Sequence, residues 1–205
     1  VKNGDTLYSI AWRYGLDYRQ IARINGIGRD FRIDAGQELR LKTSASHVKV
    51  ANKPVSTVKT PTVVQKPIRK KAVASSQVSE KNAALSHKLQ KVKWRWPAKG
   101  KVINGYSSKG SVNKGINLAG SRGEPVYAAA SGKVVYAGSG LLGYGNLIII
   151  NHNREYLSAY AHNSLILVKE NENVNVGAKV AEIGSSGATR MMLHFEIRKD
   201  GKPVN

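Results

Sequence analysis

The sequence contains no cysteine among its 205 residues. Disulfide bonds and thiolate metal sites are therefore excluded, whereas the redox compartment is left open. Long hydrophobic runs are also missing, since no stretch approaches the roughly 20 apolar residues of a membrane-spanning helix. No signal peptide precedes the opening Val1-Lys2-Asn3-Gly4-Asp5, a pattern typical of a first strand. We therefore expect a trimmed chain, whose start says little about its localisation.

Acidic residues are scarce, with 13 Asp and Glu against 33 Lys and Arg, which gives a formal net charge of +20. The charge is about +3 in residues 1–43, about +10 in 44–93 and about +7 in 94–205. Such an excess suits polyanions, namely nucleic acid, anionic lipid or acidic cell-wall polymers. The most basic segment has no aromatic residue before Trp94, so it lacks the stacking pattern of a nucleic-acid module. We expect a solvated, self-repelling linker there and no nucleic-acid partner.

The first 42 residues have the pattern of a compact β-α-α-β unit. A helix is predicted after Asp5 or Thr6, either of which can cap it, and Gly15 ends it. A second short helix follows Asp17, and a closing strand is predicted over 39–41, where leucines alternate. The apolar positions of the first helix have the spacing of one helical face: Leu7, Ile10, Ala11 and Tyr14.

Three segments of this unit resemble the LysM domain, a glycan-binding module: V-K-N-G-D-T-L-Y-S-I-A, I-A-R-I-N-G-I and I-D-A-G-Q-E-L-R-L. The one departure is Ala35, where the pattern usually has proline. The resemblance implies a groove for N-acetylglucosamine chains between two loops. Three of its residues also have a structural explanation, because Asp5 and Thr6 can cap the first helix and Leu7 belongs to the core. The implied glycan-binding residues are Gly4, Asp5, Thr6 and Leu7 on one side and Asn25, Gly26 and Ile27 on the other.

Composition divides the chain into three parts, with boundaries at 1–43, 44–93 and 94–205. The middle part is rich in Lys, Ser, Thr, Val, Ala and Gln and is interrupted by prolines, so it cannot bury enough apolar surface to fold alone. We predict a disordered tether, with one marginal helix over 79–92.

Beyond residue 94 the hydrophobic period becomes two, and glycine turns separate many short segments. This pattern predicts a mostly β, antiparallel domain, as a barrel or sandwich. The segment 147–150 is apolar throughout, which indicates a central strand. The other strands are predicted over 101–103, 115–118, 126–128, 133–137, 156–160, 179–183 and 193–198.

Several segments of this domain closely resemble the lysostaphin-like, or LytM-type, zinc metallopeptidases: N-K-G-I-N-L-A-G, Y-L-S-A-Y-A-H-N, M-M-L-H-F-E-I-R, G-Y-G-N-L-I-I-I and S-G-K-V-V-Y-A-G. In the active family a His, an Asp four residues later and the second His of an H-x-H strand bind zinc. Three such ligands leave the fourth position for a water whose pKa the zinc lowers.

The ligand positions of this chain are mostly replaced. Asn113 and Asn117 stand where the family has His and Asp, and Met192 stands for the first His of H-x-H. Only His162 and His194 remain, and one good ligand of three will not hold a catalytic zinc. We expect a degenerate domain without metal, cofactor or catalytic residues. An active peptidase, or an unrelated metal site built on the two histidines, is the alternative.

The combination of a LysM-like unit, a basic linker and a degenerate LytM-like domain opening with W-x-W-P resembles the murein hydrolase activators of Gram-negative bacteria. That resemblance implies a non-enzymatic activator of a periplasmic N-acetylmuramoyl-L-alanine amidase, anchored on peptidoglycan during septal splitting and daughter-cell separation. It also implies an outer-membrane lipoprotein, with a lipid anchor absent from this chain and a closing segment truncated at residue 205. A divergent peptidoglycan endopeptidase and a purely structural wall-binding protein are the alternatives. The implied partner-binding groove consists of Asn113, Asn117, Tyr144, His162, Met192 and His194.

Overall fold

The computed structural model describes residues 1–42, 92–109 and 113–205. The predicted linker lies outside these residues except for its last two positions, as does nearly all of the helix predicted over 79–92. Within the described ranges, no helix combines the length and the apolar character needed to cross a bilayer. We call residues 1–42 the N-terminal module and residues 92–205 the β domain.

Two short helices form the N-terminal module, as predicted. Helix α1 (Leu7–Tyr14) begins after Thr6, whose side chain accepts a hydrogen bond from the backbone of Ser9 while the Ser9 hydroxyl oxygen accepts one from the backbone of Thr6. It ends at Gly15, which adopts the left-handed conformation with φ 64°. Helix α2 (Tyr18–Ile24) begins after Asp17, whose carboxylate accepts from the backbone of the next residue but one.

The predicted strands at the two ends of the module do not form. The ends lie together, because the terminal ammonium of Val1 donates to the carbonyl oxygen of Gln37 (2.9 Å) and Gly36 donates to Val1 (2.9 Å). Only these few backbone groups pair, which is too little for a ladder. The helical face also differs from the prediction: Tyr14 is 57% exposed, whereas Trp12 is buried at 2%.

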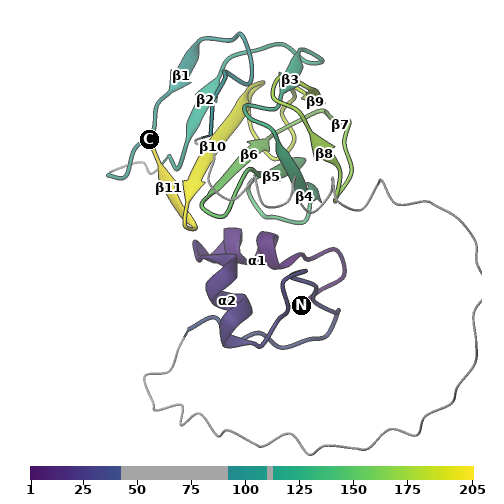
Figure 1. Ribbon diagram of the computed structural model, residues 1–205. Helices are drawn as coiled ribbons and strands as arrows, with labels where there is room; N and C mark the ends of the chain where they lie inside the picture. Colours follow the sequence, from purple (N-terminus) through teal and green to yellow (C-terminus); the bar gives the residue numbers. More distant parts are fainter. Residues whose placement is uncertain (43–91, 110–112) are drawn as a thin grey trace, which may run out of the picture.

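The β domain contains two antiparallel sheets (Figure 1). The large eight-stranded sheet has the order β1-β2-β10-β6-β5-β4-β8, with β11 paired to β10, and the small sheet has the order β3-β9-β7. The strands are β1 (Val102–Asn104), β2 (Ile116–Leu118), β3 (Pro125–Tyr127), β4 (Gly132–Gly138), β5 (Leu147–Asn151), β6 (Tyr156–Ala161), β7 (Leu165–Ile166), β8 (Asn173–Val174), β9 (Lys179–Glu182), β10 (Leu193–Lys199) and β11 (Lys202–Val204).

The middle strands of the large sheet are buried on both faces. One face packs against the small sheet through side chains such as Leu118, Tyr160 and Leu193. The other face contributes Ile149 and Ala159, among others, to a second core that also contains residues of α1 and α2. Strand β5 therefore runs between two cores, which explains its unbroken apolar sequence.

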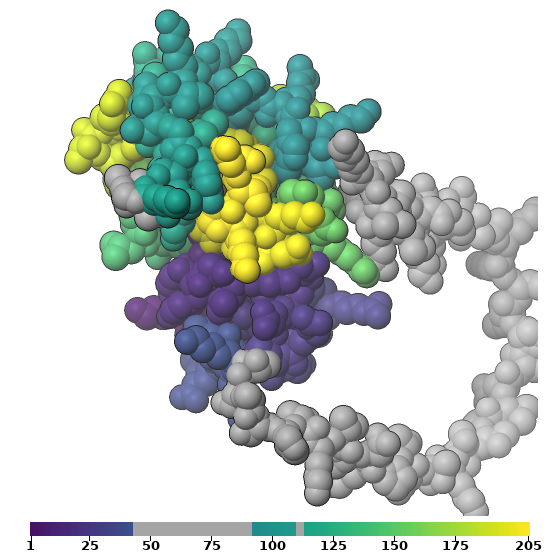
Figure 2. Space-filling model, turned by 90° about the vertical axis from the view of Figure 1, so that its left-hand side faces the viewer, coloured from purple at the N-terminus to yellow at the C-terminus, as the bar shows by residue number. Residues whose placement is uncertain are grey.

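The N-terminal module is seated on the β domain at the end of β10, and the space-filling view shows the two in direct contact (Figure 2). The guanidinium of Arg198 donates to the carbonyl oxygen of Trp12 (2.7 Å), and its central carbon lies 3.6 Å from the Trp12 ring centroid. Arg19 forms an ion pair with Asp200 (2.5 Å). The N-terminal module thus covers a face of the large sheet whose burial the sequence does not predict.

Candidate functional site

Three of the predicted groove residues meet where β2, β10 and β6 lie side by side. His194 pairs in register with Asn117 on one side and with Ala161 on the other. His162 follows β6 in the left-handed conformation, with φ 64°, and its ring centroid lies 6.0 Å from that of His194. The structure therefore brings Asn117, His162 and His194 together.

Both ring nitrogens of His194 are engaged by neighbouring oxygen atoms. Its Nδ1 lies 2.6 Å from Oδ1 of Asn117, and its Nε2 lies 3.1 Å from Oε1 of Glu196. Both ring nitrogens therefore already have hydrogen-bond partners within the protein.

His162 is held differently. Its Nδ1 lies 2.8 Å from the carbonyl oxygen of Ser186, which leaves Nε2 as the ring nitrogen on the groove side of that contact. Burial lowers the pKa of His162, and the nearby His194 lowers it further, although the Ser186 carbonyl partly offsets this. Its ring is thus favoured in the neutral form.

Asn113 and Met192 flank this group without bonding to it. The amide of Asn113 donates to the carbonyl oxygen of Gly105 (2.9 Å), in the connection between β1 and β2. The backbone of Met192 donates to Gly184 (3.0 Å), just before β10 begins. Among the residues that the structure describes, no hydrogen bond joins either side chain to the two histidines.

The donor set does not fit the zinc site of an active metallopeptidase. Two of the three ligand positions carry neutral amides, and the first His of H-x-H is replaced by a thioether, which is a soft ligand. In the described ranges, no three His, Cys, Asp or Glu side chains are grouped so that they could hold a metal ion. We therefore derive no chemical step through a metal.

The ring of Tyr144, another of the predicted groove residues, lies 6.0 Å from the ring of His194, measured between the centroids. Its hydroxyl donates to Glu196 (2.8 Å) and accepts from Arg198 (3.3 Å), and burial raises its pKa to about 12. Its ring meets that of Trp12 edge-on, with 6.5 Å between the centroids. Tyr144 is therefore half-buried beneath the N-terminal module.

Glu196 and Arg198 connect the groove to the module and were not identified as site residues from sequence. Both are 1% exposed, and their side chains form an ion pair (3.0 Å). Burial alone would raise the pKa of Glu196, but hydrogen bonding to His194 and the charge of Arg198 outweigh it and lower the pKa. Since His194, Glu196 and Arg198 lie two residues apart along a strand, the sequence indicated that they share one face of it. Nothing in the sequence indicated that Trp12 would cover that face.

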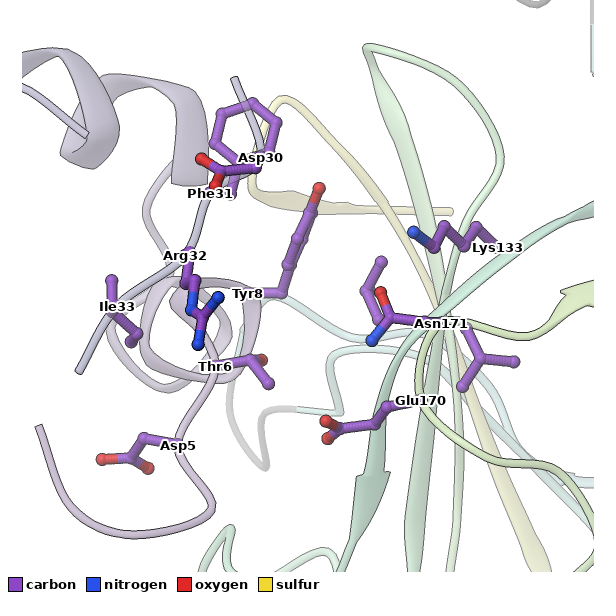
Figure 3. A pocket seen from close by; sticks show the side chains of 12 residues that line it. Asp5, Thr6, Tyr8, Asp30, Phe31, Arg32, Ile33, Lys133, Glu170 and Asn171 are labelled. Carbon is purple, nitrogen blue, oxygen red and sulfur yellow. The ribbon is translucent and has the colours of Figure 1, made fainter. Parts of the chain in front are cut away.

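Two of the predicted glycan-binding residues, Asp5 and Thr6, line a pocket of about 480 Å³ (Figure 3). Its lining on the module side also includes residues 30–33, rather than the predicted Asn25, Gly26 and Ile27. Asn25 instead binds the backbone of Ile21 and Arg40. The remaining predicted residues are divided between core and turns: Leu7 is fully buried, Ile27 packs against the core, and Gly4 and Gly26 have positive φ.

Family models match both parts of the chain: LysM domain over residues 1–42 and Peptidase family M23 over residues 111–205. These matches confirm both sequence-based resemblances. A lipoprotein NlpD/LppB homolog of Pseudomonas aeruginosa is 44% identical over 219 residues, covering 100% of this chain and 74% of that protein. The murein hydrolase activator NlpD of Escherichia coli is 37% identical over 249 residues, covering 100% of this chain and 65% of that protein.

Among solved structures, a zinc-containing peptidase from Vibrio cholerae is similar to the chain, with 30% identity and a TM-score of 0.53. The match covers 56% of this chain and 39% of that chain. The large-sheet architecture is thus shared with a zinc-containing peptidase, while two of the three ligand positions of this chain carry Asn113 and Asn117, and Met192 replaces the first His of H-x-H.

Proposed function

The chain belongs to the NlpD/LppB lipoprotein family, and we propose that it is a non-enzymatic activator of a periplasmic zinc-dependent N-acetylmuramoyl-L-alanine amidase. The observation that carries this proposal is the state of the groove. Its fold is that of a peptidase, but two of its three ligand positions are amides, and the third, His194, has both ring nitrogens bonded to neighbours. Such a groove can bind a partner but has no group poised to hydrolyse a peptide.

Activation would act through a shift between states of the amidase. A partner whose active site is blocked by its own helix has a closed and an open form. An activator that binds the open form better raises the population of that form. The groove offers a bound peptide or helix a mixed surface of amides, imidazoles and a tyrosine ring. Asn113, Asn117, Tyr144, His162, Met192 and His194 would make these contacts.

The N-terminal module would hold the activator on peptidoglycan. The match to the LysM domain supports this role, as does the chain's basic charge of +20. We place the protein in the periplasm as an outer-membrane lipoprotein, because relatives carry the name lipoprotein. The protein would act in septal peptidoglycan splitting and daughter-cell separation.

A direct binding measurement tests this function. The full chain, titrated into a purified amidase by calorimetry, is expected to bind, and His162→Ala is expected to weaken binding about tenfold, as for the loss of a buried contact. The control is His152→Asn, because His152 lies in a turn elsewhere and bonds to Ser131 and Ser158. Equal affinities for all three proteins would refute a role for the groove.

Two other functions remain to be separated from this one. A divergent endopeptidase would release dye from labelled peptidoglycan in the absence of any amidase. A purely structural wall protein would bind peptidoglycan and leave amidase activity unchanged. The donor set of the groove disfavours the first, and the activator name of the E. coli relative disfavours the second.

A further inference from the structure

The pocket beside α1 has two walls that come from different parts of the chain (Figure 3). Thr6, Tyr8 and Phe31 belong to the N-terminal module, whereas Lys133 and Asn171 belong to the β domain. The two sets of side chains face one another across a space of about 480 Å³, which is within the range of small-ligand sites. A pocket of this kind exists only while the module is seated on the β domain.

The wall from the β domain is held rigid by backbone bonds. Asn171 donates to the carbonyl oxygen of Val134 (2.8 Å), and Val134 donates to that of Glu172 (2.8 Å). The side chain of Glu172 in turn accepts from the backbone of Lys169 (2.9 Å). Asn171 itself has φ 71°, a conformation that asparagine tolerates better than most residues. Its amide is therefore presented toward the pocket by a preorganised turn (Figure 3).

The wall from the module offers aromatic surface. Tyr8 and Phe31 meet edge-on with 5.8 Å between their centroids, and the Tyr8 hydroxyl accepts from Asn151 of the β domain. Phe31 has φ 56°, a left-handed conformation that is strained for a bulky residue. Strain of this kind concentrates at ligand sites, and here it holds a ring at the pocket.

The pocket lining carries charges of both signs: Asp5, Asp30 and Glu170 are acidic, whereas Arg32 and Lys133 are basic. Asp5 is already engaged by Arg13 (3.2 Å) and by the backbone of Lys2. Lys133, by contrast, has no acidic partner within residues 1–42, 92–109 and 113–205, and its ammonium points toward the module (Figure 3). Where Lys133 and Asn171 line the wall from the β domain, an ammonium and an amide together suit a sugar that carries both an N-acetyl group and a carboxylate.

We propose that this pocket is a composite peptidoglycan site, completed by the β domain. Lys133 binds a carboxylate of the muramyl side chain or its stem peptide, and Asn171 binds an amide of the same strand. The inference rests on the proposed glycan binding of the module, and it adds that half of the site lies outside that module. Since the ligand contacts both parts, it also favours their seated arrangement.

Calorimetry on the full chain with two soluble probes tests the composite site. One probe is chitotetraose, which has no carboxylate, and the other is a disaccharide-tetrapeptide fragment of peptidoglycan. Lys133→Gln is expected to weaken binding of the fragment about five- to tenfold, as for the loss of a charge-assisted contact, and to leave chitotetraose binding unchanged. Asn171→Gly keeps the positive φ, removes the amide, and is expected to weaken the fragment about fivefold.

Lys101→Gln is the matched control, because Lys101 is an exposed lysine of the β domain that does not line the pocket. Wild-type affinity for the fragment in both pocket variants would overturn the composite site while leaving glycan binding by the module intact. Failure of the wild type to bind either probe would overturn the glycan binding itself, and the composite site with it.

Discussion

His194 is the residue at which the sequence and the geometry combine most informatively. From sequence it occupies a ligand position whose companions are replaced by Asn117 and Met192. The structure adds that its ring is fixed from both sides, by Asn117 and by Glu196. The identity of the replaced ligands could be read from the motifs, but the role of Glu196 could not, because a polar residue on a strand is ordinarily solvated.

Restoring the missing ligands should restore zinc binding. The triple variant Asn113→His, Asn117→Asp and Met192→His recreates the ligand set of the peptidase family at the position of His194. We expect about one zinc per chain in this variant, measured by atomic absorption after dialysis, and none in the wild type. Stoichiometric zinc in the wild type would contradict our account of the groove.

His152 is expected to make stability depend on pH. Burial lowers its pKa to about 4, while its ring bonds to Ser131 and Ser158. The unfolded chain takes up a proton near pH 6.5 and the folded chain does so only near pH 4, so stability falls as the pH drops through this window. The loss is on the order of 3 kcal/mol across the window.

Urea denaturation at pH 7.0, 5.5 and 4.5 measures this effect. The variant His152→Asn cannot charge, so its free energy of unfolding should vary less between these values than that of the wild type. It should also be less stable at pH 7, because its fit to Ser131 and Ser158 is poorer. Parallel pH profiles for the two proteins would be evidence against a buried neutral histidine.

At the scale of elements, the sequence predicted the longer strands and both helices of the N-terminal module to within about two residues. The hydrophobic pattern was sufficient to predict β4, β5, β6 and β10, and the caps at Thr6 and Gly15 were sufficient to predict the ends of α1. Strands β7 and β8, which were not predicted, have two residues each, and this is too short to show an alternation of period two. Their existence depends on partners elsewhere in the chain.

Strand β10 shows why half of the site escaped prediction. Its alternation was correct, with Leu193 and Phe195 facing one core. The opposite face carries the polar residues His194, Glu196 and Arg198, yet Arg198 is buried there against Trp12. A helix from a distant part of the sequence supplies that cover, and no local pattern encodes such a contact.

One carbon atom added at Gly201 should disturb the contact between the start of β11 and the N-terminal module. Gly201 precedes β11 with φ 81°, and a Cβ at this position would lie 2.4 Å from the carbonyl oxygen of Leu16. Gly201→Ala should therefore push the module away from the β domain. Gly177→Ala is the control, because Gly177 also has φ 81° and its Cβ would meet only a side-chain atom of Arg95, at 3.5 Å.

Both variants strain the backbone, but only the first should also open the interface. We expect Gly201→Ala to lower the free energy of unfolding by about 1–3 kcal/mol more than the control, as for overpacking. It should also increase binding of a hydrophobic dye, because Ile149 and Ala159 become accessible. Identical urea midpoints and dye signals for the two variants would argue against a seated module.

At the scale of the whole molecule, the groove, the module and the pocket form one connected arrangement. The side chains of His194, Glu196 and Arg198 link the groove to Trp12 through successive contacts. The pocket lies between the same two parts of the chain. Peptidoglycan binding and partner binding are therefore expected to influence one another in the full chain.

The central claim is that the groove activates a partner and does not itself cut peptidoglycan. Dye release from labelled peptidoglycan tests it most directly, with the full chain alone, a purified periplasmic amidase alone, and the two together. We predict no release by the chain alone, strong stimulation of the amidase by the wild-type chain, and loss of that stimulation with His162→Ala but not with Lys101→Gln. Release by the chain alone, or full stimulation by His162→Ala, would contradict the claim.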